Sequence, residues 1–230
     1  PTTTVKLIFI HHSCGGNWLA DIGEHDQAGG LAQELMDNHY FVSATNYGWG
    51  PGEIGTRTDI ANWPEWFTDT VMNQVYTEYG QNICGLGDYS DSCFGNWARL
   101  EDPNPTRENE IVMFKSCYPN SDLYQEPSEQ QTIADAQLVY NSILNYFEAH
   151  RDKLFIVITA PPMAEGEYTQ NNPDVPAAER AANARTFNNW LVNEWLTTYS
   201  YDNVAVFDYY NVLTSNGSYG RIDDTSVITE

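Results

Sequence analysis

Five short apolar runs, separated by stretches with helical spacing, constrain this chain more than any other feature of its sequence. The runs cover residues 5–10, 40–44, 110–115, 154–160 and 204–208. The first is β-branched and almost continuously apolar, as expected of a strand covered on both faces of a parallel sheet. Strands that alternate with helices predict βαβ units with right-handed crossovers. The sequence therefore predicts one α/β domain over residues 1–230, with ligands bound beyond the carboxyl ends of the strands.

The most regular helical pattern lies in the middle of the chain. Apolar residues recur at helical spacing from Ile133 to Phe147. Ser128, with Gln131 three residues later, predicts a capping box in front of this helix. Further helices are expected over residues 30–38, 59–79 and 177–198.

The charge balance excludes several classes of partner. The chain has 10 basic and 32 acidic residues, a net charge of −22 at pH 7. Such a chain repels nucleic-acid phosphates and anionic lipids. Its longest apolar stretch, residues 154–160, is far shorter than the roughly 18 residues of a membrane span. We expect no nucleic acid and no membrane as partner, whereas neutral polymers, cations and small uncharged esters remain acceptable.

Four cysteines, an even number, predict two disulfides and an oxidising, extracellular compartment. Cys84 and Cys93 are expected to pair within one short, turn-rich loop. Since no CxxC spacing occurs and the histidines do not complete a zinc pattern, neither a metal nor a cofactor is expected. The chain starts at Pro1 without a basic and apolar leader, as in a secreted protein whose signal peptide has been removed, or in a trimmed chain.

The residues that follow the first strand form a polar, glycine-rich turn. Ser13 in this turn can present its hydroxyl at the edge of the sheet, where backbone amides can face a developing oxyanion. A serine that caps the next helix is the alternative. After the third strand, Asn120 can donate to an oxyanion or simply stabilise a turn.

These strand ends together resemble the SGNH (GDSL-type) hydrolase family. Its conserved blocks are a strand followed by Gly-Asp-Ser, a loop glycine, and Gly-x-Asn-Asp. The corresponding residues in this sequence are His11-His12-Ser13, Gly48 or Gly50, and Tyr118-Pro119-Asn120-Ser121.

The resemblance implies a three-layer, flavodoxin-like fold with a five-stranded parallel sheet in the order 2-1-3-4-5. It also implies metal-free ester hydrolysis through an acyl-enzyme at Ser13. The oxyanion hole would consist of the Ser13 amide, the Gly48 amide and the Asn120 side chain. Because the first and third strands are neighbours in this sheet order, a second disulfide is expected between Cys14 and Cys117.

The sequence departs from the family at the fourth block, Asp-x-x-His after the fifth strand, since residues 209–230 contain no histidine. Three explanations stay open. The histidine lies in a continuation of the chain, His11 replaces it, or the domain binds without catalysis. His12, at the position of the family's aspartate, is expected to hold the turn. Residues 209–230 also contain too few apolar residues to form a helix that covers the sheet. A missing C-terminal segment or a second chain is therefore expected to complete the fold.

The aromatic residues near the strand ends suggest a substrate. Trp18, Tyr47, Trp49 and Tyr118 are candidate binding residues, and Trp63 and Trp66 are candidates for the wall of the same groove. We expect a secreted serine esterase that removes acyl groups from carbohydrate or other small esters. One alternative is a polysaccharide-active enzyme that uses His/Tyr acid–base chemistry, with Tyr47 and Tyr118 as candidates. The other is a non-catalytic carbohydrate-binding or extracellular assembly protein.

Overall fold

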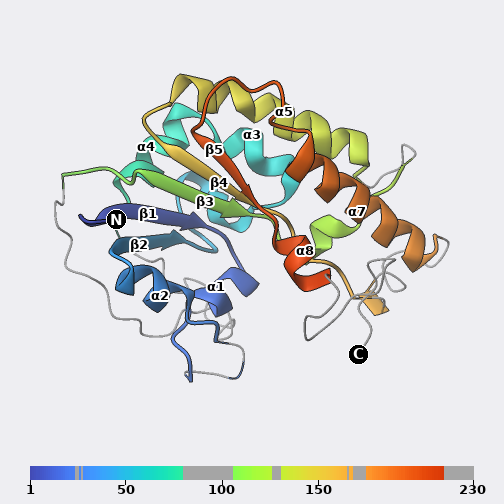
Figure 1. Cartoon of the computed structure of the whole chain (residues 1–230), viewed down its shortest axis with the longest axis horizontal. Helices are drawn as coiled ribbons and strands as arrows, with labels where there is room; N and C mark the ends of the chain where they lie inside the picture. The colour runs from blue at the N-terminus through green and yellow to red at the C-terminus, as the bar shows by residue number, and fades with distance from the viewer. Residues whose placement is uncertain are drawn as a thin grey trace.

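The computed structural model describes residues 1–23, 26, 28–79, 106–125, 131–164, 166–167 and 175–214. Its centre is a five-stranded, all-parallel sheet in the order β2-β1-β3-β4-β5 (Figure 1). The expected α/β fold and the expected strand order are therefore confirmed. The strands are β1 (Val5–Ile10), β2 (Tyr40–Thr45), β3 (Ile111–Lys115), β4 (Leu154–Ile158) and β5 (Val204–Phe207).

Helices lie on both faces of this sheet (Figure 1). One face carries α1 (Cys14–Leu19) and α2 (Leu31–Asp37). The opposite face carries α3 (Trp63–Trp66), α4 (Asp69–Thr77), α5 (Ile133–Ala149) and α7 (Ala177–Asn193). The short helix α8 (Tyr209–Thr214) follows β5 at the carboxyl edge of the sheet.

Side chains of β1 point alternately to the two faces of the sheet and so contribute to two separate parts of the core. Ile8 and Ile10 point into the larger cluster, which packs against α3, α4, α5 and α7. Leu7 and Phe9 point the other way, into a smaller cluster that includes residues of α1 and α2. All four side chains are buried. Since successive side chains of a strand face opposite sides, a continuously apolar run is what this doubly covered position requires.

The start of α5 differs from the expected one. Thr132 is its N-cap, accepting from the Asp135 amide at 3.1 Å, and the Asp135 carboxylate accepts in return from the Thr132 amide at 3.1 Å. The expectation that Ser128 caps this helix is wrong. Ser128 itself lies outside the described residues. The same capping-box chemistry occurs four residues later, directly before the first residue of the apolar pattern.

Part of the smaller face of the sheet remains open towards β5. A hollow of about 460 Å³ is bounded there by Met113, Ile156 and Ile158 of the sheet, together with Phe207 and Tyr209. Phe207 keeps 51% of its surface exposed. The missing segment or second chain that the sequence led us to expect over this face stays a prediction.

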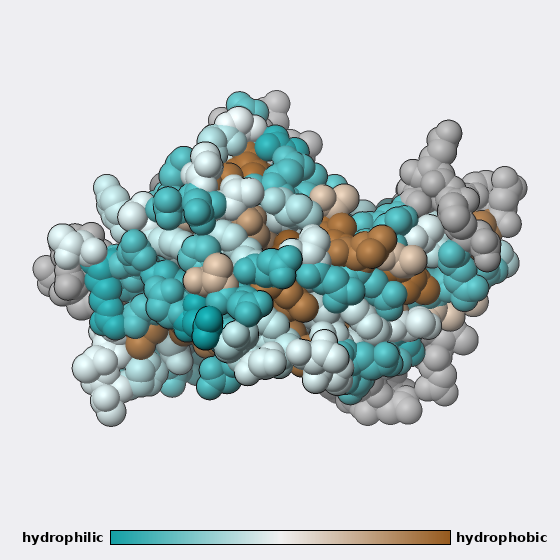
Figure 2. Space-filling model, turned by 90° about the horizontal axis from the view of Figure 1, so that it is seen from above, coloured by the Kyte–Doolittle hydropathy of each residue, from teal (hydrophilic) through white to brown (hydrophobic). Residues whose placement is uncertain are grey.

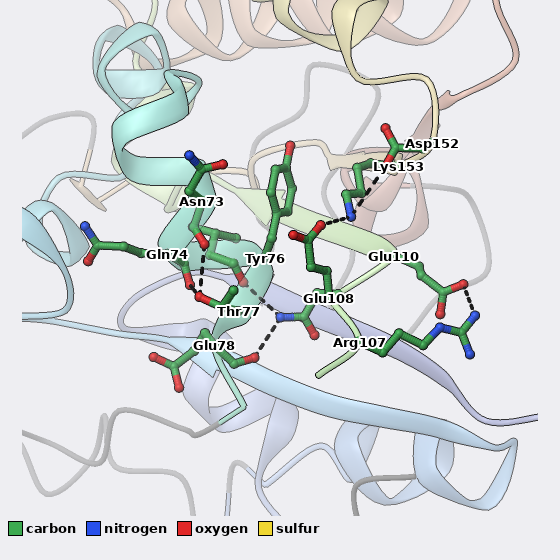
Figure 3. A network of polar contacts seen from close by, with 12 residues as sticks. Asn73, Gln74, Tyr76, Thr77, Glu78, Arg107, Glu108, Glu110, Asp152 and Lys153 are labelled. Carbon is green, nitrogen blue, oxygen red and sulfur yellow. Dashed lines mark hydrogen bonds and ion pairs between the residues drawn. The ribbon is translucent and has the colours of Figure 1, made fainter. Parts of the chain in front are cut away.

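The amino ends of the strands are held by a separate polar network (Figure 3). Lys153, just before β4, pairs with Glu108, just before β3, at 2.5 Å. The Asn109 side chain donates to the carbonyl oxygens of Val75 and Glu78, at 2.9 and 2.7 Å. This network lies at the edge opposite to the carboxyl ends, so it joins α4 to the sheet without belonging to the candidate site.

The outer surface is mainly hydrophilic on the side of α5. Figure 2 shows this face from above, with hydrophilic residues over most of it and hydrophobic residues in separate small patches. The buried residues of α5, Ala136, Tyr140, Ile143 and Phe147, lie on its inner side. Among the described residues, no helix combines the length and apolar character needed to cross a membrane.

Candidate functional site

Ser13 occupies a strained turn between β1 and α1. Its backbone angles are φ 49° and ψ −125°, and its side chain makes no capping hydrogen bond with the helix that it precedes. A non-glycine residue in such a region costs about 1–3 kcal/mol and persists only where its surroundings impose it. Within the described residues, nothing binds the Ser13 hydroxyl. Its role as a helix-capping serine is therefore not supported.

Gly15, two residues after Ser13, lies directly against the His11 side chain. A Cβ atom on Gly15 would lie only 2.6 Å from Cγ of His11, so that only glycine fits there. His11 is completely buried, and its ring lies 4.8 Å from that of Phe9. Burial, followed by the charge of Lys115, holds the pKa of His11 well below its usual value. His11 is thus a packed, neutral residue beneath α1, and the structure gives no support to its use as the substitute base.

His12 joins the first loop to the second. Its ring stacks on that of Tyr47, with the centroids 4.7 Å apart and the planes inclined by 15°. Burial, followed by the charge of Lys115, lowers the pKa of His12 to about 4, against an opposing effect of Asp59. His12 is therefore neutral at pH 7, in agreement with a residue that holds the turn.

Gly48 and Gly50 both have left-handed backbones, with φ of 72° and 75°. A Cβ atom on Gly48 would meet open space, whereas one on Gly50 would lie 3.1 Å from the Ile54 side chain. The open position beside Gly48 leaves room for a ligand to approach its backbone. Its assignment as an oxyanion donor stays a prediction.

Asn120 is buried and bound at both ends of its side-chain amide. Its Oδ1 accepts from the Ile60 amide at 2.7 Å, and its Nδ2 donates to Asp59 Oδ1 at 2.7 Å. Asp122, two residues after Asn120, forms an ion pair with buried Arg180 of α7, with both N···O distances 2.6 Å. The loop that carries Asn120 is therefore fixed against α7 and the Asp59 turn.

Cys14 and Cys117 are brought together as expected, but both are free thiols in this structure. Their sulfur atoms lie 3.6 Å apart. The Nζ atom of buried Lys115 lies 3.3 Å from the Cys14 sulfur. The disulfide between them stays a prediction, and Cys84 and Cys93 lie outside the described residues.

The aromatic candidates separate into two groups. Trp18 and Tyr118 line a hollow of about 400 Å³ with Cys14, Pro161 and Tyr209. Trp49, in contrast, is buried and stacks on Trp66 at 5.6 Å, and Trp63 and Trp66 are completely buried. The expectation that Trp63 and Trp66 wall a groove is wrong, because both belong to the core.

Sequence reasoning missed two residues of this site. Asp59 follows no strand, and its local pattern, a capping box with Asn62, indicates only the start of a helix. Lys115 did have a signal, because it ends a continuously apolar strand and is therefore expected to be enclosed. Its side chain is only 1% exposed, and a buried ammonium group must find a partner inside the protein.

Compared with known proteins, the chain matches no family model, and no curated protein matches its sequence. Among the described residues, no group of three or more His, Cys, Asp or Glu side chains is placed to hold a metal ion. The site must accordingly be interpreted from its own chemistry.

Proposed function

We propose that this chain is a serine-dependent carboxylic ester hydrolase with Ser13 as the nucleophile. The conformation of Ser13 carries the proposal, because α/β-hydrolases place their nucleophile on a strained turn between a strand and a helix. The proposal also rests on the resemblance of the strand ends to SGNH hydrolases, with Asn120 and the Gly48 amide as oxyanion donors beside the Ser13 amide.

Three loops meet around this turn. The His12–Tyr47 stack connects the loops after β1 and β2. The 3.6 Å approach of Cys14 and Cys117 connects the loops after β1 and β3. Such convergence at the carboxyl edge of a parallel sheet favours a ligand site. An oxyanion that forms on Ser13 would then lie near preorganised donors, which is where such donors are most effective.

The mechanism also needs a base, since a serine hydroxyl is a weak nucleophile at neutral pH. No described histidine hydrogen-bonds to Ser13. The resemblance assigns this role to a histidine after the fifth strand, where the sequence has none. An external base can replace a missing histidine, and this makes the proposal testable on the chain as it is.

The proposed substrate class is based on the residues that line the hollow of about 400 Å³ and on the net charge of the chain. Trp18, Tyr118 and Tyr209 provide flat aromatic faces of the kind that stack on sugar rings. The net charge of −22 disfavours anionic substrates. We therefore propose neutral esters, in particular acylated carbohydrate, as substrates, and a secreted protein as their enzyme.

The test is hydrolysis of p-nitrophenyl acetate with increasing imidazole, compared between the wild type and Ser13→Ala. We expect an imidazole-dependent rate above the buffer blank that Ser13→Ala abolishes. Ser142→Ala, which removes the hydroxyl of an exposed helical serine, serves as the matched control. Equal rates in the wild type and Ser13→Ala at every imidazole concentration would overturn the proposal.

A further inference from the structure

Cys14 and Cys117 form a cluster of reactive groups that the proposed ester hydrolysis does not use. Cys14 begins α1, and Cys117 follows β3, with their sulfur atoms 3.6 Å apart. The two residues are 103 positions apart in the chain. Since neither sulfur has to move far to reach the other, the pair can pass between dithiol and disulfide with small changes in the fold.

Lys115 supplies the charge that this cluster needs. Its side chain is 1% exposed, and its Nζ atom lies 3.3 Å from the Cys14 sulfur and 5.2 Å from the centroid of the Trp18 ring. In the described part of the chain, no carboxylate pairs with Lys115. A buried ammonium group without an anion is costly, and a thiolate on Cys14 provides that anion.

The two thiols consequently differ in their acidity. The hydrogen bond from Cys117, with the charge of Lys115, lowers the pKa of Cys14 to about 6, although burial acts in the opposite direction. The same hydrogen bond and burial raise the pKa of Cys117. At pH 7, therefore, Cys14 is the thiolate, and Cys117 is the thiol that donates to it.

Of the described charged side chains that face the hollow beside Cys14, Glu167 is the one carboxylate, and it is not among the groups that shift the pKa of Cys14. The ionisable side chains that face this hollow are Tyr118, Glu167 and Tyr209. Burial raises the pKa of both tyrosines, so that both stay neutral at pH 7. Lys115 is thus the only cation found next to Cys14 among the described residues.

The hollow of about 400 Å³ gives Cys14 an entrance. Cys14 is one of its lining residues, with Trp18, Tyr118, Pro161 and Pro162, whereas Cys117 is not. A small molecule in this hollow can therefore reach the thiolate first. Its largely aromatic and proline-rich wall suits an uncharged, compact ligand, and the acidic chain disfavours an anionic one.

We propose that Cys14 attacks small, uncharged disulfides in this hollow, and that Cys117 resolves the product. The Cys14 thiolate attacks one sulfur of the small disulfide and forms a mixed disulfide with it. The S–S bond of the small disulfide breaks, and its other half leaves as a first thiolate that takes a proton from water. Cys117 loses its proton to water and attacks the Cys14 sulfur of the mixed disulfide. The second thiolate leaves and is protonated. The two cysteines are oxidised by two electrons to a disulfide, and the small disulfide is reduced to two thiols.

The first experiment uses 4,4′-dithiodipyridine on the reduced, full chain, with peptide mass mapping to identify the cysteines that react. We expect a Cys14–Cys117 disulfide and two released thiopyridines for each pair formed. Cys117→Ser should stop at a mixed disulfide on Cys14 with one thiopyridine released. A mixed disulfide that persists on Cys14 in the wild type, or no reaction at Cys14 in the folded protein, would overturn the proposal.

The second experiment measures alkylation of Cys14 by iodoacetamide as a function of pH, again by mass mapping. We expect the rate to rise about tenfold per pH unit up to a midpoint near pH 6 and then to level off. In Lys115→Met the midpoint should move upward by about one pH unit or more. If that variant does not fold, the wild-type profile still decides, since a midpoint above pH 8 contradicts the thiolate.

This inference does not depend on the proposed esterase. Ser13→Ala removes the proposed nucleophile of ester hydrolysis but keeps both cysteines, so the disulfide chemistry should persist in this variant. Each proposal can therefore fail while the other stands.

Discussion

The side-chain amide of Asn120 donates a 2.7 Å hydrogen bond to the carboxylate of Asp59, across 61 positions of the chain. The bond fixes the amide plane of Asn120 and directs its remaining N–H away from Asp59. A donor held in this way does not have to reorganise when charge develops on a substrate oxygen. The Asn120–Asp59 pair is thus the link between the fold of the third loop and the proposed chemistry.

Replacing Asn120 with alanine should lower the imidazole-dependent ester hydrolysis by about 100-fold or more. It should also reduce the free energy of unfolding by about 1–3 kcal/mol, because the Ile60 amide loses its acceptor in the interior. Rates at saturating p-nitrophenyl acetate and urea unfolding measure the two effects. Asn38→Ala, on the exposed end of α2, is the control. An unchanged rate would leave Asn120 with a structural role only.

The strain at Ser13 predicts an unusual order of stability. Ser13→Gly should be more stable than Ser13→Ala by about 1 kcal/mol, because glycine adopts positive φ without the clash of a Cβ atom. Both variants lack the hydroxyl, so the comparison isolates the backbone. Urea unfolding of the two variants gives the difference, and equal stabilities would contradict the strained turn.

His12 predicts a loss of stability in acid. Its pKa is about 4 in the folded protein against an ordinary 6.5, so between these values the unfolded chain binds more protons. The contribution of neutral His12 to the free energy of unfolding is therefore fully present above pH 6.5 and is lost as the pH falls through 4. His12→Phe keeps a ring to stack on Tyr47 but cannot be protonated, and it should flatten this part of the profile. Urea unfolding at a series of pH values from 7 to 4 measures it; identical slopes in both proteins would contradict the assignment.

Removing only one partner of the Arg180–Asp122 ion pair should destabilise the protein more than removing both. Arg180 is completely buried, so Arg180→Met leaves the Asp122 charge without its partner and should cost about 3–5 kcal/mol. The double variant Arg180→Met, Asp122→Leu should recover most of that loss. A double-mutant cycle in urea decides. Additive effects would show that the two side chains do not act together.

Much of the fold could be predicted because its signals are local. Continuous apolar runs mark strands that are buried on both sides, and the positions of all five were found. The cap of α5 was not, since Ser128 and Thr132 are each followed three residues later by an amide or acidic residue, and spacing alone does not choose between them. The site was predicted less completely, for a related reason.

Sequence spacing could not show which side chains are enclosed. His11 stands two residues before Ser13, yet it is buried beneath Gly15. Trp63 and Trp66 follow the second loop, yet they fill the core. Lys115 and Asp59 act through partners distant in the chain, which no local pattern reveals.

The central claim is that Ser13 is the nucleophile, and its most direct test is covalent labelling with a fluorophosphonate. The full chain is treated with and without imidazole, both folded and in urea, and the adduct is located by peptide mass mapping. The account predicts an adduct on Ser13 in the folded protein that imidazole increases and urea removes. A folded protein that carries no adduct on Ser13, or labels it no faster than the unfolded chain, would contradict the claim.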